Sequence, residues 1–171
     1  AAAADGGGRT RSGRRRVLVL MPWYGAGQGQ GQSELVARTA TLDATIASVR
    51  HCGVFDVRIV VAVCERQDLD AVVRRDIDDV LYLPGLVKPD KLGAAALLAA
   101  SRLIRNATLD GIGSSGTFVG SLRAHAAKMP TGALPARLRA RWEQRGPVDW
   151  AAPDSYLYYT ESDQVLFSNG A

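Results

Sequence analysis

The chain alternates between short runs of consecutive apolar residues and longer segments in which apolar residues recur every three or four positions. The apolar runs are Val17–Met21, Val57–Val63, Val80–Leu83 and Tyr156–Thr160. Continuous runs of this kind are typical of strands that are buried on both faces, as in a parallel sheet. We therefore expect these four segments to be mainly parallel strands at the centre of one sheet.

The segments between the runs have the spacing of amphipathic helices. After the first run, Ser33 is a suitable N-cap and Gly53 a suitable C-terminal stop. The apolar face between them consists of Leu35, Thr39, Leu42, Ile46 and Val49. A short helix is expected over Gln67–Arg75. A third helix, capped by Asp90, is expected to bury Leu92, Ala96, Ala99 and Leu103.

The order strand, helix, strand, helix, strand predicts an α/β fold with parallel strands and right-handed crossovers. Residues 107–131 have no pattern that assigns them to an element. Pro135–Arg145 predicts a further, basic helix in which Leu138 and Trp142 lie one turn apart. We expect the arginines of this helix to form a solvated face.

The positive charge is confined to the start of the chain. Of 21 basic and 17 acidic residues, five arginines and one aspartate fall within residues 1–16, which leaves sixteen of each sign in the remainder. Residues 1–15 are therefore expected to be a disordered basic tail rich in Ala, Gly and Arg, and residues 16–171 one domain. A neutral domain of this kind gives no reason to expect a nucleic-acid partner.

Several other classes of protein are disfavoured. The glycine-rich loop Gly25–Gln32 has Gln30 where a dinucleotide-binding loop has its third glycine, which argues against a Rossmann cofactor site. Cys52 and Cys64 lack the spacing of a zinc site, and they either pair or are two buried thiols. No stretch of about 18 apolar residues is present, so we expect no membrane segment in this chain.

The last apolar run ends in two carboxylates. Glu161 and Asp163 follow Tyr156–Thr160 directly, and residues two apart on a strand point to the same side. Ligands of open α/β sheets collect at the carboxyl ends of the strands. Two adjacent carboxylates repel each other unless a cation lies between them, and Mg²⁺ or Mn²⁺ is suited to oxygen ligands. The pattern therefore indicates a metal site.

An apolar strand that ends in Glu161-Ser162-Asp163 resembles the Asp-x-Asp-like motif of glycosyltransferases with the GT-A fold. The resemblance covers about Val17 to Phe167. It implies a Rossmann-like three-layer α/β/α fold with a mainly parallel central sheet that is incomplete at its C-terminus. It also implies that Glu161 and Asp163 bind Mn²⁺ or Mg²⁺, with Glu in place of the first Asp of the motif.

The same resemblance implies a set of nucleotide-sugar-binding residues. Pro22 and Trp23 follow the first strand, where these enzymes begin to cradle the base. Glu65 ends the second strand, at a position that is commonly acidic and near the uracil or ribose. Lys91 begins a stretch in which a basic residue and small residues recur beside the nucleotide, and Ser162 lies within the acidic motif.

The activity implied is metal-dependent transfer of a sugar from a UDP- or GDP-sugar to a hydroxyl of a glycan or protein acceptor. The implied location is the Golgi or secretory-pathway lumen, if the chain is part of a membrane-anchored enzyme. GT-A enzymes continue past the acidic motif into an acceptor-binding half. We therefore expect a fragment of a longer enzyme, which alone can be inactive, or an incomplete relative.

No catalytic base is identified, since of the only two histidines His51 is expected to interact with the dipole at a helix C-terminus and His125 lies in unassigned sequence. Two alternatives remain open. One is a GT-B-type N-terminal domain, which would bind nucleotide without metal. The other is a non-catalytic α/β interaction module derived from a glycosyltransferase, which would bind neither. A structural role for the acidic pair is also open, in which Glu161 or Asp163 caps a helix or pairs with an arginine such as Arg141.

Overall fold

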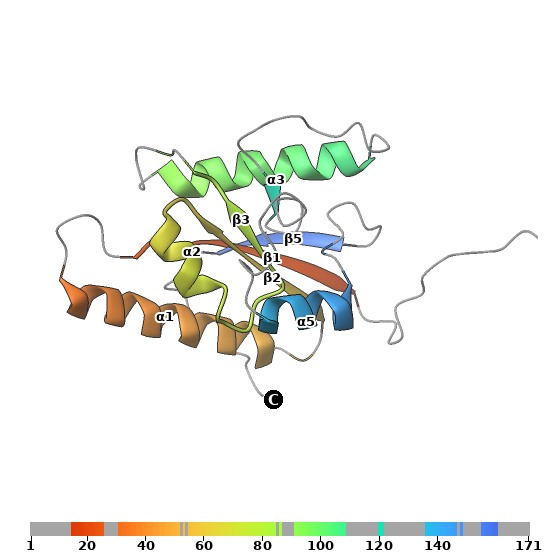
Figure 1. The fold of residues 1–171 in the computed structure, drawn as a ribbon. Helices are drawn as coiled ribbons and strands as arrows, with labels where there is room; N and C mark the ends of the chain where they lie inside the picture. Colours follow the sequence, from red (N-terminus) through yellow and green to blue (C-terminus); the bar gives the residue numbers. More distant parts are fainter. Residues whose placement is uncertain are drawn as a thin grey trace, which may run out of the picture.

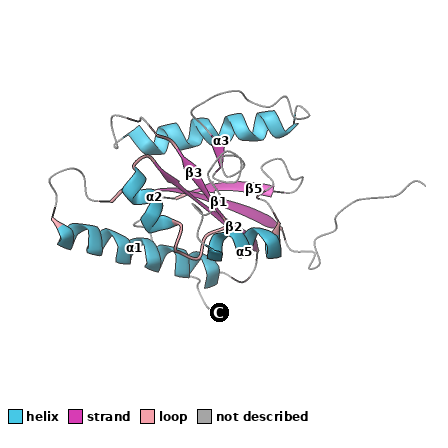
Figure 2. Cartoon of the chain, in the orientation of Figure 1, coloured by secondary structure: helices cyan, strands magenta, loops and turns pink. Residues whose placement is uncertain are grey.

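The computed structural model describes residues 15–25, 31–51, 53, 55–84, 86, 91–108, 120–121, 136–146, 148 and 155–160. These residues form a sheet with helices on both faces (Figures 1 and 2). The sheet has five strands in the order β4-β3-β2-β1-β5. Their bounds are β1 Arg16–Pro22, β2 Asp56–Val63, β3 Asp79–Tyr82, β4 Gly120–Ser121 and β5 Ser155–Tyr159.

Four of the five strands are parallel. Strand β1 pairs in parallel with β2 on one side and with β5 on the other, so that Arg16 is opposite both Asp56 and Ser155. Strand β2 pairs in parallel with β3, and the two-residue β4 is antiparallel to β3. The prediction of an α/β fold with a mainly parallel sheet is thus confirmed.

The helices form two outer layers around the sheet. Helices α1 (Gln32–His51), α2 (Arg66–Val72) and α5 (Ala136–Arg145) lie on one face, and α3 (Leu92–Thr108) lies on the other (Figure 1). Alternate residues of β1 contribute to two separate cores. Val19 and Met21 face the layer of three helices, whereas Leu18 and Leu20 face α3. This alternation explains why the apolar runs are continuous.

The expected faces of the two long helices are the buried ones. Helix α1 buries Leu42, Ile46 and Val49, and also Thr45. Helix α3 buries Leu92, Ala96, Ala99 and Ala100. The small side chains of the three alanines let the helix lie close to the sheet. Gly53 follows α1 with a positive φ of 53°, as expected of a helix stop. No helix in the described part of the chain is long and apolar enough to cross a membrane.

Strand β5 is parallel, as predicted, but it is not central among the described strands. It pairs with β1 alone there, at one end of the strand order. Tyr156, Leu157 and Tyr158 are 54%, 38% and 42% exposed. Their aromatic and aliphatic composition suits a pleated surface, but it does not specify whether the strand has a neighbour on both sides.

Helix α2 is shorter than the predicted Gln67–Arg75. It ends at Val72, and the chain then turns, with Arg75 N donating to Val72 O and Ile77 N donating to Arg75 O. The turn directs the Asp78 side chain toward the sheet, where it accepts hydrogen bonds from residues of α1, β2 and α5. The helical pattern of the sequence does not reveal this competing requirement.

Candidate ligand-binding edge at the carboxyl ends of the strands

The carboxyl ends of the parallel strands lie along one edge of the sheet. The strands that follow β1 in the sequence are added first on one side of it and later on the other. From β1 the chain adds β2 and then β3 on one side, and β5 is added on the other side of β1. The point between β1 and β5 is therefore a topological switch point, where open α/β sheets leave a crevice for ligands. The sequence motifs that were predicted to bind a ligand follow these strands.

The backbone fixes the chain at the switch point as far as Thr160. Thr160 N donates to Leu20 O at 3.1 Å, and Thr160 is only 1% exposed. Glu161 is the next residue. Glu161, Ser162 and Asp163 lie outside the described residues, so their predicted roles stay predictions. In the described part of the chain, no group of three or more His, Cys, Asp or Glu side chains is placed to hold a metal.

Three other predicted residues lie at this edge. Pro22 is the last residue of β1 and is buried. Glu65 follows β2 and is exposed at the position before α2, where its carboxylate makes no capping bond to the helix. Lys91 is exposed directly before α3. The edge thus presents one acidic and one basic side chain on either side of the buried end of β1.

The first turn of α3 packs on the ends of β1 and β5. A Cβ added to Gly93 would lie 2.4 Å from the hydroxyl oxygen of Tyr159 and 3.9 Å from Cγ of Pro22. A larger residue at this position would require the Tyr159 side chain to shift. The contact places the amino end of α3, with Lys91, at the switch point. A helix amino end and a lysine both favour an anionic ligand.

Trp23 lies at the same edge but is part of the core rather than a surface for a base. Its side chain is 3% exposed and packs in the core on the α1 side of the sheet. Its Nε1 donates to Arg38 O at 3.3 Å, which ties the end of β1 to α1. Trp23 therefore positions the start of the following loop, and its ring is not presented to a ligand.

Sequence reasoning missed Asp68, a buried carboxylate next to Gly25. Its side chain is 1% exposed, and neither oxygen makes a hydrogen bond of normal geometry. A Cβ added to Gly25 would lie 2.6 Å from its Oδ1, so the backbone at Gly25 lies close to the carboxylate. Burial raises the pKa of Asp68, an effect that the Gly25 backbone amide opposes and the charge of Glu65 reinforces. No signal in the sequence distinguishes Asp68 from a solvated helix residue.

The free thiol of Cys64 also lies at this edge, between β2 and Glu65. Burial, with a smaller contribution from the charges of Glu65 and Asp68, raises its pKa to about 11. The thiol is therefore almost fully protonated at neutral pH, which makes it unsuitable as a nucleophile. Cys52 lies outside the described residues, so whether its thiol is buried stays a prediction.

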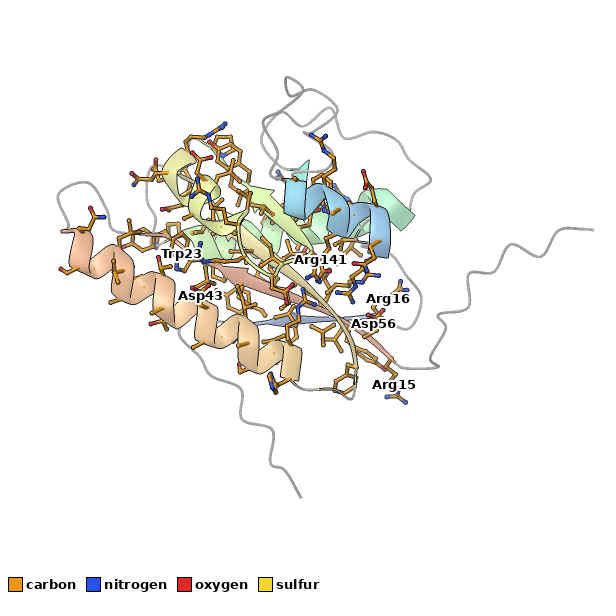
Figure 3. The ribbon with its side chains drawn as sticks, turned by 60° about the horizontal axis from the view of Figure 1, so that its bottom comes forward. Arg15, Arg16, Trp23, Asp43, Asp56 and Arg141 are labelled. Atoms are coloured by element: carbon orange, nitrogen blue, oxygen red, sulfur yellow. The ribbon has the colours of Figure 1, made fainter. Side chains whose placement is uncertain are left out.

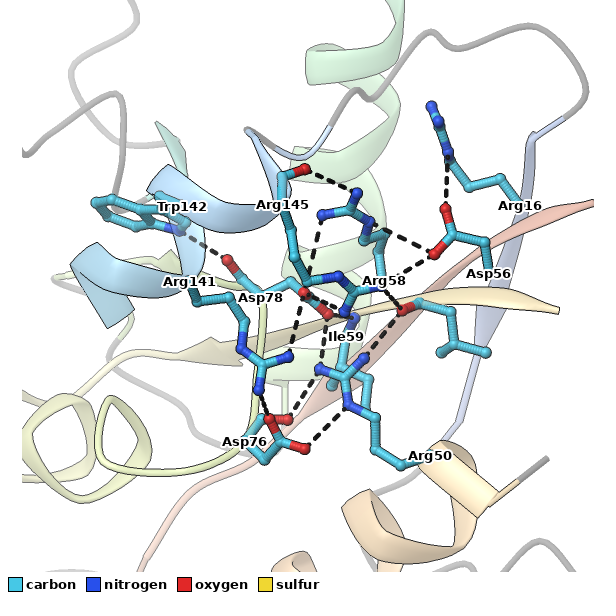
Figure 4. A network of polar contacts seen from close by, with 11 residues as sticks. Arg16, Arg50, Asp56, Arg58, Ile59, Asp76, Asp78, Arg141, Trp142 and Arg145 are labelled. Atoms are coloured by element: carbon cyan, nitrogen blue, oxygen red, sulfur yellow. Dashed lines mark hydrogen bonds and ion pairs between the residues drawn. The ribbon is translucent and has the colours of Figure 1, made fainter. Parts of the chain in front are cut away.

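The opposite, amino edge of the sheet holds a network of arginines and aspartates (Figure 4). Asp78, whose side chain is 2% exposed, is at its centre. Its Oδ2 accepts hydrogen bonds from Arg50 Nη2 at 2.7 Å and from Ile59 N at 2.8 Å. Its Oδ1 accepts one from Arg145 Nη1 at 2.8 Å. The carboxylate thus joins α1, β2 and α5.

Two further aspartates complete this network. Asp56 accepts a hydrogen bond from Arg145 Nη2 at 2.9 Å and lies 3.6 Å from Arg16 Nε. Asp76 pairs with Arg141. Figure 3 shows Arg16, Asp56 and Arg141 toward one end of β1, far from Trp23 at the other. The network is therefore a structural feature of the edge that does not bear the candidate site.

The arginines of α5 were expected to be a solvated face, and for Arg141 and Arg145 this is wrong. Both are partly buried by their pairs with aspartates, because Leu138 and Trp142 press the helix onto the sheet. Burial and neighbouring arginines lower the pKa of Arg141. Arg139, by contrast, is exposed. Pairing with Asp76 also commits Arg141 to the amino edge, away from the end of β5.

No family model matches this chain, and neither the curated proteins nor the solved structures include one that is significantly similar to it.

Proposed function

We propose that this chain is the nucleotide-sugar-binding half of a GT-A-type glycosyltransferase. The observation that supports this most is the position of β5. It is the parallel neighbour of β1 across the switch point, and Thr160 is fixed beside β1. Glu161 is the residue after Thr160, which supports a motif that begins at the edge where sheets of this topology bind nucleotides and other ligands.

The proposal gives a role to each of the predicted site residues except Trp23. Asp163 and Glu161 hold Mn²⁺ or Mg²⁺, which stabilises the negative charge that grows on the departing diphosphate. Lys91, at the amino end of α3, attracts the same diphosphate. Glu65 accepts hydrogen bonds from the ribose or the base, and Pro22 forms the apolar floor between them. Ser162 donates a hydrogen bond within the motif.

The proposal is tested by titration calorimetry of UDP and GDP, with and without Mn²⁺, against the wild type and Asp163→Ala. We expect one nucleotide to bind only with Mn²⁺, and Asp163→Ala to weaken that binding by on the order of 100-fold, since even partners of metal ligands are worth about 10- to 100-fold. Asp43→Ala is the matched control. Asp43 is an exposed aspartate on α1, paired with Arg75 at 2.9 Å, and its loss should leave binding unchanged.

Two other results of this titration would favour the two alternative classes of protein. Nucleotide binding that ignores both Mn²⁺ and Asp163→Ala would refute the metal site and favour a GT-B-type domain. Absence of binding to UDP and GDP, in a chain shown to be folded by its unfolding transition, would favour a non-catalytic module. The same titration with the chain extended beyond Ala171 separates that module from a half-site that lacks a ligand.

A further inference from the structure

An apolar groove lies on the α1 side of the sheet, along β5. Its volume is about 530 Å³. It is lined by side chains of β1, β2 and β5 and by residues at the end of α1 and just after it, namely Val17, Val19, Val49, Phe55, Val57, Tyr156, Leu157 and Tyr158, with Arg15 as the one charged residue. Groove volumes of this size accommodate several side chains or a small ligand.

The groove exists because the described helices leave part of β5 uncovered. Tyr156 is opposite Val17 in the register of the sheet, and Tyr158 is opposite Val19, so both rings are on the face that α1 covers. They are nevertheless 54% and 42% exposed, and Phe55 is 38% exposed. A cluster of exposed aromatic side chains beside an edge strand is normally covered by another segment.

We propose that the segment that follows β5 folds back into this groove and fills it with Val165, Leu166 and Phe167. Residues 161–171 lie outside the described part of the chain. They contain these three consecutive apolar residues, with polar residues on both sides. They are the first run of apolar residues after β5, which pairs with β1 alone among the described strands. The docking does not depend on the proposed nucleotide binding.

The length of the connection fits. After Thr160, four residues, Glu161–Gln164, precede the apolar triplet. Connections of two to five residues commonly reverse the chain between adjacent elements, and four residues span up to about 13 Å. The groove residues Tyr156 and Tyr158 lie about 7 to 13 Å back along β5 from Thr160. The triplet therefore reaches the groove without any displacement of the strand.

The tether also favours this occupant over a second copy of the chain. A segment on a short linker is present at its own groove at an effective concentration of about millimolar. A second copy would have to reach that concentration in solution to compete. Docking of the triplet would anchor the chain on both sides of Asp163, between β5 and the groove.

The test places a nitroxide label just past the triplet, at Asn169→Cys, in a Cys52→Ser background. Cys64 is buried and stays unlabelled. The amide signals of Val17, Val49 and Phe55 in an ¹⁵N spectrum should be lost in the labelled chain and return when the label is reduced. Leu166→Asp/Phe167→Asp should restore these signals in the labelled chain. Gln164→Asp/Ser168→Asp adds the same two charges outside the triplet and should not.

Two results would overturn the proposal. One is that the groove signals survive in the labelled chain. The other comes from mixing two kinds of chain, one with ¹⁵N but no nitroxide and one with the nitroxide but no ¹⁵N. The proposal is overturned if the groove signals of the ¹⁵N chains are lost in this mixture and the measured mass in solution is that of two chains. The second result would show that the groove is an interface between copies.

Discussion

Replacing Asp78 with alanine should cost this domain a large part of its stability. The carboxylate accepts hydrogen bonds from Arg50 of α1, the Ile59 amide of β2 and Arg145 of α5, while being almost completely buried. Its removal leaves two partly buried guanidinium groups and a buried amide without that partner. The helices α1 and α5 would then be joined by ion pairs at the amino edge only through Asp76 in the described network, which pairs with Arg50 and with Arg141.

The magnitude follows from what remains after the substitution. Removing one partner of a buried ion pair typically costs about 3–5 kcal/mol when the remaining charge is left uncompensated. We expect the lower end of that range for Asp78→Ala, because Arg50 keeps Asp76 and Arg145 keeps Asp56 as partners. Asp78→Asn keeps an oxygen acceptor and the shape but loses the charge, so we expect about 1.5–3 kcal/mol, the value of one hydrogen bond to a charged group. Both are large fractions of a total stability of about 5–15 kcal/mol.

The assay is urea unfolding followed by circular dichroism, with Asp70→Ala as the control. Asp70 is 58% exposed and lies 3.6 Å from Arg66, itself 61% exposed, so this pair should be worth less than about 1 kcal/mol. The denaturant slope should be unchanged in all three variants, so that shifts of the midpoint report stability. A loss for Asp78→Ala no larger than that for Asp70→Ala would refute the reasoning, since the arginines would then recover their hydration.

Two further predictions concern the carboxyl edge. Because the pKa of Asp68 is raised above 3.8, the folded state holds this proton to higher pH than the unfolded state. The contribution of Asp68 to stability is therefore full below pH 3.8 and falls as the pH rises through the folded pKa. Asp68→Asn should thus be more stable than wild type at pH 8 in urea unfolding, and a gap that does not narrow toward pH 4 would contradict this. Cys64, with a pKa of about 11, should react with iodoacetamide far more slowly in the folded than in the urea-unfolded Cys52→Ser chain at pH 8, and equal rates measured by mass spectrometry would contradict its burial.

The sheet was predictable because its strands are buried on both faces. Such strands carry apolar residues at every position, and the helices between them carry apolar residues on one side. These patterns involve residues that are close in the sequence, so a single sequence is enough to recognise them. The position of Pro22, Glu65 and Lys91 at one edge followed from the same reasoning, since parallel strands bring their carboxyl ends together.

The remaining features depend on contacts between residues distant in the sequence. Arg145 and Asp56 are 89 positions apart, and nothing local to either one identifies its partner. Asp68 lies in a helix whose other charged residues are exposed, and it is buried close to Gly25, which is distant in the sequence. Trp23 resembled a ligand-binding residue because it follows a strand, but its contact with Arg38 of α1 determines where its ring lies.

The two edges of the sheet also differ in charge, and this bears on how a nucleotide could bind. The amino-edge network contains five arginines (Arg16, Arg50, Arg58, Arg141 and Arg145) and three aspartates, whereas the whole domain beyond residue 16 is neutral. The proposal puts Glu161 and Asp163 beside Glu65 at the carboxyl edge, where the three carboxylates would outnumber Lys91. An edge with that balance repels a nucleoside diphosphate unless a cation intervenes. Nucleotide binding should therefore require the divalent metal, and screening by monovalent salt alone should not replace it, because close pairs are screened only weakly.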